Sequence, residues 1–341
     1  MRRLAFLLYS LLVIAAGEVK AQAPMSLSIA PDARAAGIGN AGLATTPDAA
    51  AQHWNVAKYA FADDPAGLQL SYIPWMPNLA GGMNILYLSG YKIFGTQAVS
   101  ASLHYFSAGE IVSDNEWTDY TASPVDWAVD VGYSKHFGRW FSLGVAFRYV
   151  MVDYMKRDRA FSLPTARTLA ADIGACFRLP VAFGEWTFGA ALTNAGGKLE
   201  MGEGHHLALP ANAGAGMQVA WSLKDPHRVL VAIDVNKPLT GKNNTSGHAF
   251  DTPHAGGGVE YSYAQQIALR AGYHYTGSGG NNRSYLTVGA GVYFRNIRFD
   301  IAYWATTGRR SVALHNTLHF SLGYTFASRA TRPVSDEQPV P

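Results

Sequence analysis

The chain has 341 residues, a formal net charge of +3 and one cysteine, Cys176. Charged residues make up 15% of it, whereas roughly a quarter is usual in soluble proteins, and aromatic residues reach 12%. This composition excludes an internal disulfide and a cysteine-based zinc site, and the small net charge gives no support for nucleic-acid binding.

Residues 1–23 have the three parts of a signal peptide. The chain begins with the basic "MRR", continues with the apolar "LAFLLYSLLVIAAG", and reaches small residues suited to cleavage near Ala21 or Ala23. Beyond residue 24 no run of about 18 apolar residues follows, so no transmembrane helix is expected. An exported chain of this composition is either a soluble periplasmic β protein or an outer-membrane barrel.

Residues 37–42 read "GIGNAG", which is the G-x-G-x-x-G spacing of a dinucleotide-binding loop. That loop requires a buried strand before the glycines and a helix after them. Here "SIAPDARAA" precedes the glycines and contains Pro31, and "LATTPDAAAQ" follows and breaks at Pro47. Dinucleotide binding is therefore not supported. The glycines instead predict a tightly folded plug, the hatch (residues 24–66), at the periplasmic end of a barrel, where its backbone passes close to the wall.

From residue 67 to residue 326 apolar side chains recur at every second position, which is the period of a β-strand. In residues 139–154, for example, Phe141, Leu143 and Val145 alternate with small or polar residues such as Gly144. About fourteen such segments are present, near 67–73, 82–93, 96–107, 124–137, 140–154, 167–178, 184–194, 210–222, 228–237, 254–263, 266–275, 283–294, 296–306 and 314–326. Segments of about ten residues with one apolar face are typical of outer-membrane strands.

The second face of these segments carries Gly, Ala, Ser and isolated charges, which suits a crowded or watery lumen. The candidate lumen charges are Asp130, Arg148, Asp172, Asp234, Arg270, Arg298 and Asp300. The connections alternate between short and long, as in barrels with short periplasmic turns and long outer loops. The prediction is an all-β fold, a transmembrane antiparallel up-and-down β-barrel of about 14 strands (residues 67–326) with a short N-terminal plug. Both termini are expected in the periplasm, and residues 327–341 have the composition of a disordered tail.

No residue pattern supports an enzyme. The sequence has no G-x-S-x-G, HExxH or Walker A motif. His205 and His206 lie near two glutamates, but a solvated loop pair explains them better than a surface metal site. Asp130 and Arg148 are expected to face each other on neighbouring strands and to neutralise one another. We therefore expect no catalytic residues, no cofactor and no metal.

The N-terminal stretch resembles the PorV family of the type IX protein secretion system. The resemblance rests on "SLSIAPDARAAGIGNAGLATTPDAAAQHWNVAKYAF", on "GLQLSYIPWMPNL" and on "QAVSASLHYFSAGEI". The family is similar in turn to the FadL-like transporters, which are fourteen-stranded barrels closed by an N-terminal hatch. One departure is Val56, where the family typically has a proline after Asn55. The hatch residues that carry the resemblance are Asp32, Arg34, Gly37, Gly39, Gly42, His53, Trp54 and Asn55.

The resemblance implies a cargo carrier in the outer membrane of a Gram-negative bacterium of the Bacteroidota. Such a protein receives secreted cargo proteins through their C-terminal sorting domains as they leave the large translocon barrel. It then presents them to a sortase-like attachment complex at the surface, among outer-membrane lipid and lipopolysaccharide. Binding is expected on the outer loops, where exposed aromatic and apolar residues commonly anchor protein contacts. The candidates are Trp75, Trp117, Tyr120, Tyr154 and Leu207.

Two other functions remain open. A FadL-like channel for the uptake of hydrophobic small molecules is the main alternative, and a lumen lined by apolar groups down to the hatch would favour it. A porin-like diffusion channel is weaker, because fourteen strands with a plug leave little open bore. The charged, glycine-rich second face favours a filled barrel and therefore cargo binding.

Overall fold

The computed structural model describes residues 24–76, 82–115, 118–153, 165–200, 206–239, 253–276, 284–306 and 317–326. Fourteen strands close into one antiparallel barrel, in which β1 pairs with β18. The predicted fold class and strand number are thereby confirmed. Among the described residues, none of the helices is long and apolar enough to cross a membrane.

The barrel strands follow the chain around the wall. They are β1 (Ala66–Pro74), β2 (Asn84–Phe94), β3 (Gln97–Ser107), β6 (Val125–Phe137), β7 (Phe141–Asp153), β8 (Ala166–Val181), β9 (Gly184–Gly196), β12 (Asn212–Ser222), β13 (His227–Pro238), β14 (His254–Tyr263), β15 (Ile267–Thr276), β16 (Tyr285–Phe294), β17 (Ile297–Thr306) and β18 (Thr317–Thr325). Each predicted segment overlaps one of these strands, with ends that differ by at most three residues.

Alternation of burial shows which face of the wall meets lipid. In β1, Leu68 and Leu70 are exposed, while Gln69 and Ser71 between them are buried. A one-residue slip in pairing would exchange these faces, so the alternation fixes the register of each strand. Most large apolar side chains therefore lie outside the barrel and most small and polar ones inside, although Ile85, Tyr87 and Trp304 are buried on the inner face.

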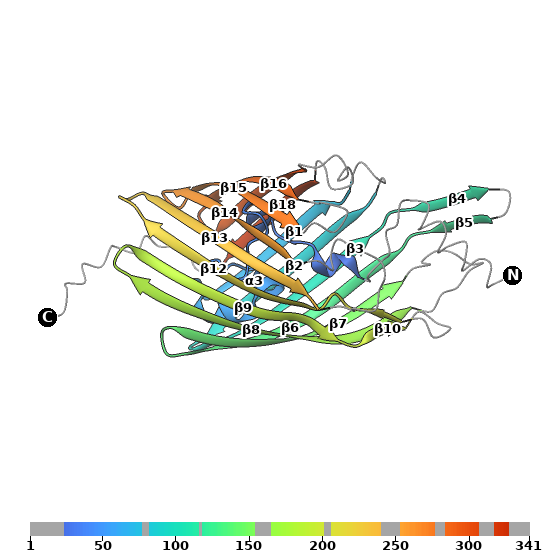
Figure 1. Cartoon of the computed structure of the whole chain (residues 1–341), viewed down its shortest axis with the longest axis horizontal. Helices are drawn as coiled ribbons and strands as arrows, with labels where there is room; N and C mark the ends of the chain where they lie inside the picture. Colours follow the sequence, from blue (N-terminus) through green and yellow to red (C-terminus); the bar gives the residue numbers. More distant parts are fainter. Residues whose placement is uncertain are drawn as a thin grey trace.

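Two hairpins were predicted as loop and are strands in the structure. β4 (Ile111–Asn115) pairs with β5 (Thr118–Ala122), and β10 (Lys198–Glu200) pairs with β11 (His206–Ala208). β4 and β5 extend beyond the barrel at one end (Figure 1). Beyond the membrane no lipid face selects apolar residues at alternate positions, so the sequence carried no barrel-like signal for them.

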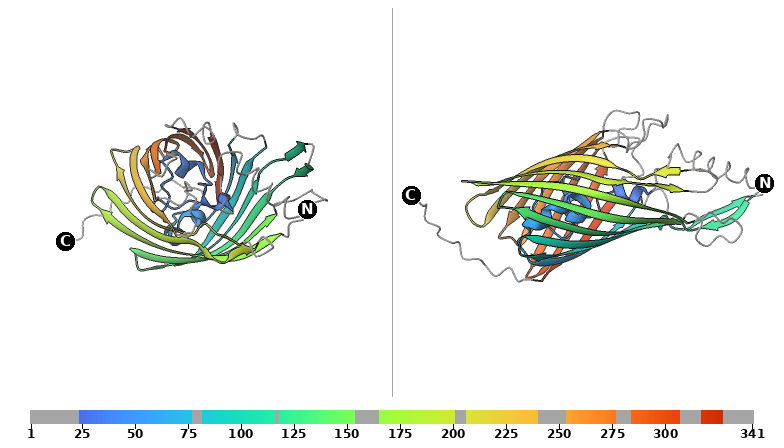
Figure 2. Two further views of the ribbon diagram at one scale, coloured as in Figure 1. Left: turned by 45° about the vertical axis from the view of Figure 1, so that its right-hand side comes forward. Right: turned by 90° about the horizontal axis from the view of Figure 1, so that it is seen from below.

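The hatch lies inside the barrel, as the blue segment within the ring of strands shows (Figure 2). It contains η1 (Met25–Ser28), α2 (Ala33–Gly37), α3 (Ala51–Trp54) and η2 (Val56–Phe61). Its helices are too short to be stable alone, so packing against the wall must hold them.

The hatch runs along the lumen from one end to the other, whereas it was predicted at the periplasmic end. At the end with the long connections, the Ser26 hydroxyl donates to Asp126 near the start of β6, at 2.5 Å. At the short-turn end, Arg178 donates to the carbonyl of Phe61 at 3.1 Å, and the Phe326 amide donates to Ala66. The described residues therefore begin near the end with the long connections and finish at the short-turn end. The position of both termini in the periplasm stays a prediction. Residues 1–23 and 327–341 lie outside the described residues.

Candidate functional site

Asp32 joins the two ends of the hatch motif. One of its carboxylate oxygens accepts from the Ala35 amide at 2.8 Å and caps α2, and the other accepts from the Trp54 indole at 2.7 Å. A side-chain oxygen at this position satisfies an amide at the helix start that has no partner within the helix. Burial, and then nearby Asp48, raise the pKa of the Asp32 carboxyl above its ordinary value.

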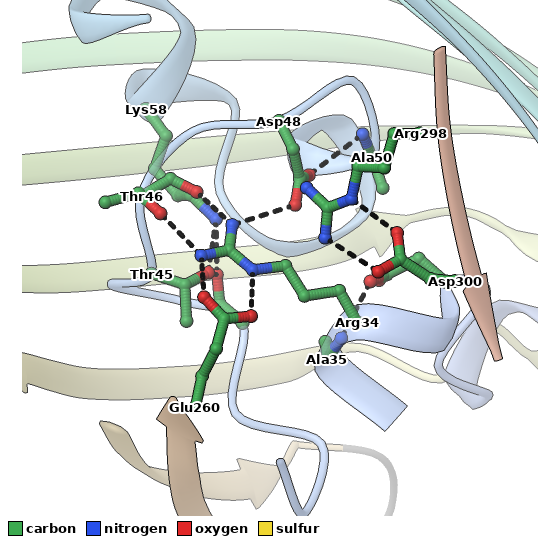
Figure 3. Close-up of polar contacts among 12 residues, drawn as sticks. Arg34, Ala35, Thr45, Thr46, Asp48, Ala50, Lys58, Glu260, Arg298 and Asp300 are labelled. Atoms are coloured by element: carbon green, nitrogen blue, oxygen red, sulfur yellow. Dashed lines mark hydrogen bonds and ion pairs between the residues drawn. The ribbon is translucent and has the colours of Figure 1, made fainter. Parts of the chain in front are cut away.

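Arg34 ties the hatch to the barrel wall (Figure 3). Its guanidinium donates to both carboxylate oxygens of Glu260 on β14, at 3.0 and 2.9 Å, and to Asp48 at 3.2 Å. Two parallel charge-assisted bonds to one carboxylate are strong and directional. Burial opposes ionisation of Asp48, but Arg34 and then Lys58 outweigh it and hold the pKa of that carboxyl below its ordinary value.

The wall extends this network with three more charged contacts. Glu260 also accepts from Arg270 at 2.6 Å, and Arg270 pairs with Asp300 at 2.8 Å. Asp300 in turn pairs with Arg298. Three of the predicted lumen charges are therefore linked through Glu260 to the hatch. Sequence reasoning missed Glu260 and Asp48, and the only signal for Glu260 was a lone acid in the glycine-rich segment "HAGGGVEYSY".

The "GIGNAG" glycines make close contact with the wall. Gly39 has φ +74°, and a Cβ added there would lie 2.5 Å from the carbonyl oxygens of Gly257 and Tyr273. Only glycine fits both this conformation and this space. The contacts lie in the halves of β14 and β15 nearer the long connections, so the predicted position at the periplasmic end is wrong. Close approach of the backbone, which the glycines predicted, is observed.

Wall side chains bind the backbone amides of the same segment. Asp234 accepts from the amides of Gly42 and Leu43 at 2.6 and 2.8 Å. The Thr287 hydroxyl accepts from the Gly39 amide and donates to the Gly37 carbonyl, each at 3.0 Å. These contacts occupy backbone groups that a pyrophosphate would need in a dinucleotide site.

The second half of the motif is fixed to the opposite wall. Asn55 caps η2 by accepting from the Ala57 amide at 3.1 Å, and it donates to the carbonyls of Leu43 and Ala175. A Cβ at Gly174 would lie 2.2 Å from the Asn55 amide oxygen. His53 contacts the rings of Trp54 and His104, and burial, followed by His104, lowers its pKa well below the ordinary value.

Arg148 forms a second charged cluster that lies within the wall. It pairs with Asp130 at 2.5 Å and with Asp172 at 3.0 Å, and it also donates to Asn194. Asp130 and Arg148 face each other across β6 and β7. A register shift between β8 and β9 near Asp172 places that carboxylate against the Asn194 amide, at 2.6 Å. Bulges of this kind commonly redirect a side chain.

A cavity of about 120 Å³ lies on the side of the hatch nearer the long connections. Its wall includes Trp54, Trp75, Tyr285 and Trp304, together with polar groups from Asn40 and Asn212. Trp75 was predicted as an exposed loop residue, but its side chain is 3% exposed and packs against Trp304 at a ring-centroid distance of 6.2 Å. That prediction of exposure is wrong, because the residue points into the barrel.

The other loop candidates have different positions. Leu207 lies in β11, half-buried against the apolar cluster that includes Leu27 and Leu199. Tyr120 lies in β5 opposite Ser113, and its side chain is outside the described part of the structure. Trp117 and Tyr154 are outside the described residues as well. A cargo-binding role for these residues stays a prediction.

A closed antiparallel barrel with an internal N-terminal hatch defines a class, the plugged outer-membrane β-barrels. The Pseudomonas putida toluene transporter TodX has a similar fold, with 14% sequence identity and a TM-score of 0.58 over 87% of this chain and 98% of that one. The Ralstonia pickettii toluene transporter TbuX (14%, TM-score 0.54, 87% and 97% covered) and a Pseudomonas aeruginosa FadL homologue (14%, TM-score 0.52, 87% and 98% covered) are also similar. At this identity the similarity shows the fold alone.

The family is shown by sequence. The model of the type IX secretion system protein PorV matches residues 17–246, and the chain belongs to that family. It is therefore an outer-membrane component of the type IX secretion system. No curated protein matches the chain.

Proposed function

We propose that this protein binds the C-terminal sorting domain of secreted cargo at the end of the barrel that carries the long connections. It would receive cargo from the large translocon barrel and present it to the sortase-like attachment complex without catalysing a reaction. Membership of the PorV family supports a role in type IX secretion.

The observation that carries the proposal is the fixed hatch. Arg34, Asn55 and the Gly39 backbone hold it to three parts of the wall, β14, β8 and β15. These contacts hold the hatch inside the lumen, which favours a filled barrel over an open channel. The surface left for binding is the end that η1, β4–β5 and β10–β11 surround.

Site-specific photocrosslinking in cells tests this proposal. A photoreactive residue at Ser113 or Leu207 is expected to crosslink to the sorting domain of cargo, because both lie on the hairpins of that end. Val288, on the lipid-facing side of β16, is the matched control and is expected to give no cargo adduct. If the hairpin positions capture no cargo while secretion proceeds, the proposal is wrong.

Uptake of hydrophobic small molecules is the second candidate. The aromatic cavity beside the hatch favours it, and the similar folds include proteins described as toluene transporters. Liposomes containing the protein would take up toluene or a fatty acid under this hypothesis. A cysteine pair at Ala33 and Ser321, whose amide and hydroxyl lie 2.9 Å apart, would hold the hatch closed. Uptake that the crosslink abolishes would favour the channel, whereas unchanged secretion without uptake would favour cargo binding.

A further inference from the structure

Three cations lie at the short-turn end of the barrel, on β2, on β6 and in the turn after β6, with β3 between β2 and β6. Lys92 follows Leu86 and Leu88 along the exposed face of β2. Lys135 follows Val131 and Tyr133 along the exposed face of β6. Arg139 lies in the turn between β6 and β7, and β3 joins β2 to β6. The side chains of Lys92 and Lys135 therefore emerge on the outer face of the wall, and Arg139 is exposed in the turn beside them.

Each cation lies over an exposed aromatic ring. The Lys92 Nζ is 5.1 Å from the centroid of the Phe94 ring, the Lys135 Nζ is 5.7 Å from that of Phe137, and the Arg139 guanidinium carbon is 6.0 Å from that of Trp140. The rings are 51%, 53% and 49% exposed. An aromatic ring at this level sits at the acyl boundary, and a basic side chain beside it reaches its charge to the headgroups.

Few acids lie beside this region: Asp63 and Asp64, just before β1, are close to Lys92, since the Tyr91 hydroxyl donates to the Asp64 carbonyl and the Ile93 amide donates to that of Pro65. Residues 82–109 and 131–145 contain no aspartate or glutamate. Within the described part of the chain, none of the three cations forms an ion pair, whereas Arg178 on the adjacent β8–β9 hairpin is paired with Glu185 at 2.6 Å. The ammonium and guanidinium donors that face away from the rings are left for an anion.

We propose that this basic–aromatic patch (Lys92, Lys135 and Arg139 over Phe94, Phe137 and Trp140) binds the headgroups of anionic phospholipids. The short turns of outer-membrane barrels face the periplasm, so the lipid belongs to the periplasmic leaflet. The phosphate pairs with the cations while the acyl chains cover the rings. Basic residues next to a membrane surface attract anionic lipid in this way. The patch lies on one side of the wall, so it orients the barrel in the membrane as well as setting its depth.

Native mass spectrometry of the detergent-solubilised protein, titrated with phosphatidylglycerol or with phosphatidylcholine of the same acyl chains, tests the proposal. The wild type is expected to bind phosphatidylglycerol about tenfold more tightly, and added salt should reduce this preference. The triple variant K92Q/K135Q/R139Q should lose most of it. The triple variant K198Q/K224Q/K237Q removes the same charge from exposed positions elsewhere and should retain it.

Two results would overturn the proposal. One is equal binding of the two lipids by the wild type, and the other is equal loss of preference in both triple variants, which would make net charge the only cause. Heat-modifiable migration in gels shows whether each variant is folded. If K92Q/K135Q/R139Q does not fold, the single variants K135Q and R139Q replace it. An unchanged preference for phosphatidylglycerol in both single variants would also overturn the proposal.

Discussion

Arg34 and Arg148 make the same kind of contact in two regions of the lumen. Each is a buried arginine bound to two carboxylates, Arg34 to Glu260 and Asp48 and Arg148 to Asp130 and Asp172. The partners of Arg148 all belong to wall strands, whereas Arg34 belongs to the hatch. The same chemistry therefore stabilises the wall in one region and retains the plug in the other.

Exchanging each arginine for methionine should separate these roles. Removing one partner of a buried ion pair costs about 3–5 kcal/mol, because a charge is left without compensation. Arg34→Met is expected to loosen the hatch and raise single-channel conductance in planar bilayers, with the unfolding midpoint of the barrel nearly unchanged. Arg148→Met is expected to lower the free energy of unfolding of the barrel while conductance stays low. Identical phenotypes for the two variants would contradict the distinction.

Gly39→Ala tests the backbone contact between hatch and wall, with Gly95→Ala as its control. Both glycines have positive φ, but a Cβ at Gly95 meets no atom within 4 Å, whereas one at Gly39 clashes with two carbonyl oxygens. Gly95→Ala is expected to cost about 1 kcal/mol from backbone strain, and Gly39→Ala about 2–3 kcal/mol more. Urea unfolding measures the loss of stability in Gly95→Ala. In Gly39→Ala, a rise in conductance would report release of the hatch. If the two variants lose equally little stability, the strands around Gly39 must shift to accommodate the added methyl group.

Thr287→Val removes a hydroxyl that serves both Gly37 and Gly39 while keeping the side-chain shape. Leaving two buried backbone groups without their partner is expected to cost about 2 kcal/mol, again at the hatch and not at the wall. Thr287→Ser keeps the hydroxyl and should behave as the wild type in conductance. A Val variant with wild-type conductance would mean that these two bonds do not retain the hatch.

A fall in pH should loosen the hatch through His53. Its pKa is lowered in the folded state, so the released state binds more protons once the pH falls below the ordinary value of 6.5. The hatch is therefore expected to lose about 1.4 kcal/mol of stability between pH 7 and pH 5.5, and conductance should rise over that range. His53→Gln should flatten this response. If His53→Gln shows the same pH dependence of conductance as the wild type, another group is responsible for it.

The strands were predictable because a lipid-facing wall repeats a local pattern. Lipid on one side and a filled lumen on the other impose alternation on every strand, and each of the fourteen predicted segments overlaps one strand. The pattern does not extend to β4–β5 and β10–β11, which lie beyond the membrane. Trp75 shows another limit, since an aromatic residue next to a turn has the same local sequence whether it points to solvent or toward Trp304.

The sequence by itself determined that the barrel has about fourteen strands, which face of each strand meets lipid, and that a glycine-rich segment before them passes close to the wall. Those features depend on residues a few positions apart. Only the tertiary structure decided which wall groups hold the hatch, such as Glu260, 226 residues from Arg34. The physical reason is that closure of the barrel brings its strands around the hatch. The sequence next to a charged residue in one strand does not show which distant charged residue it will contact in the lumen.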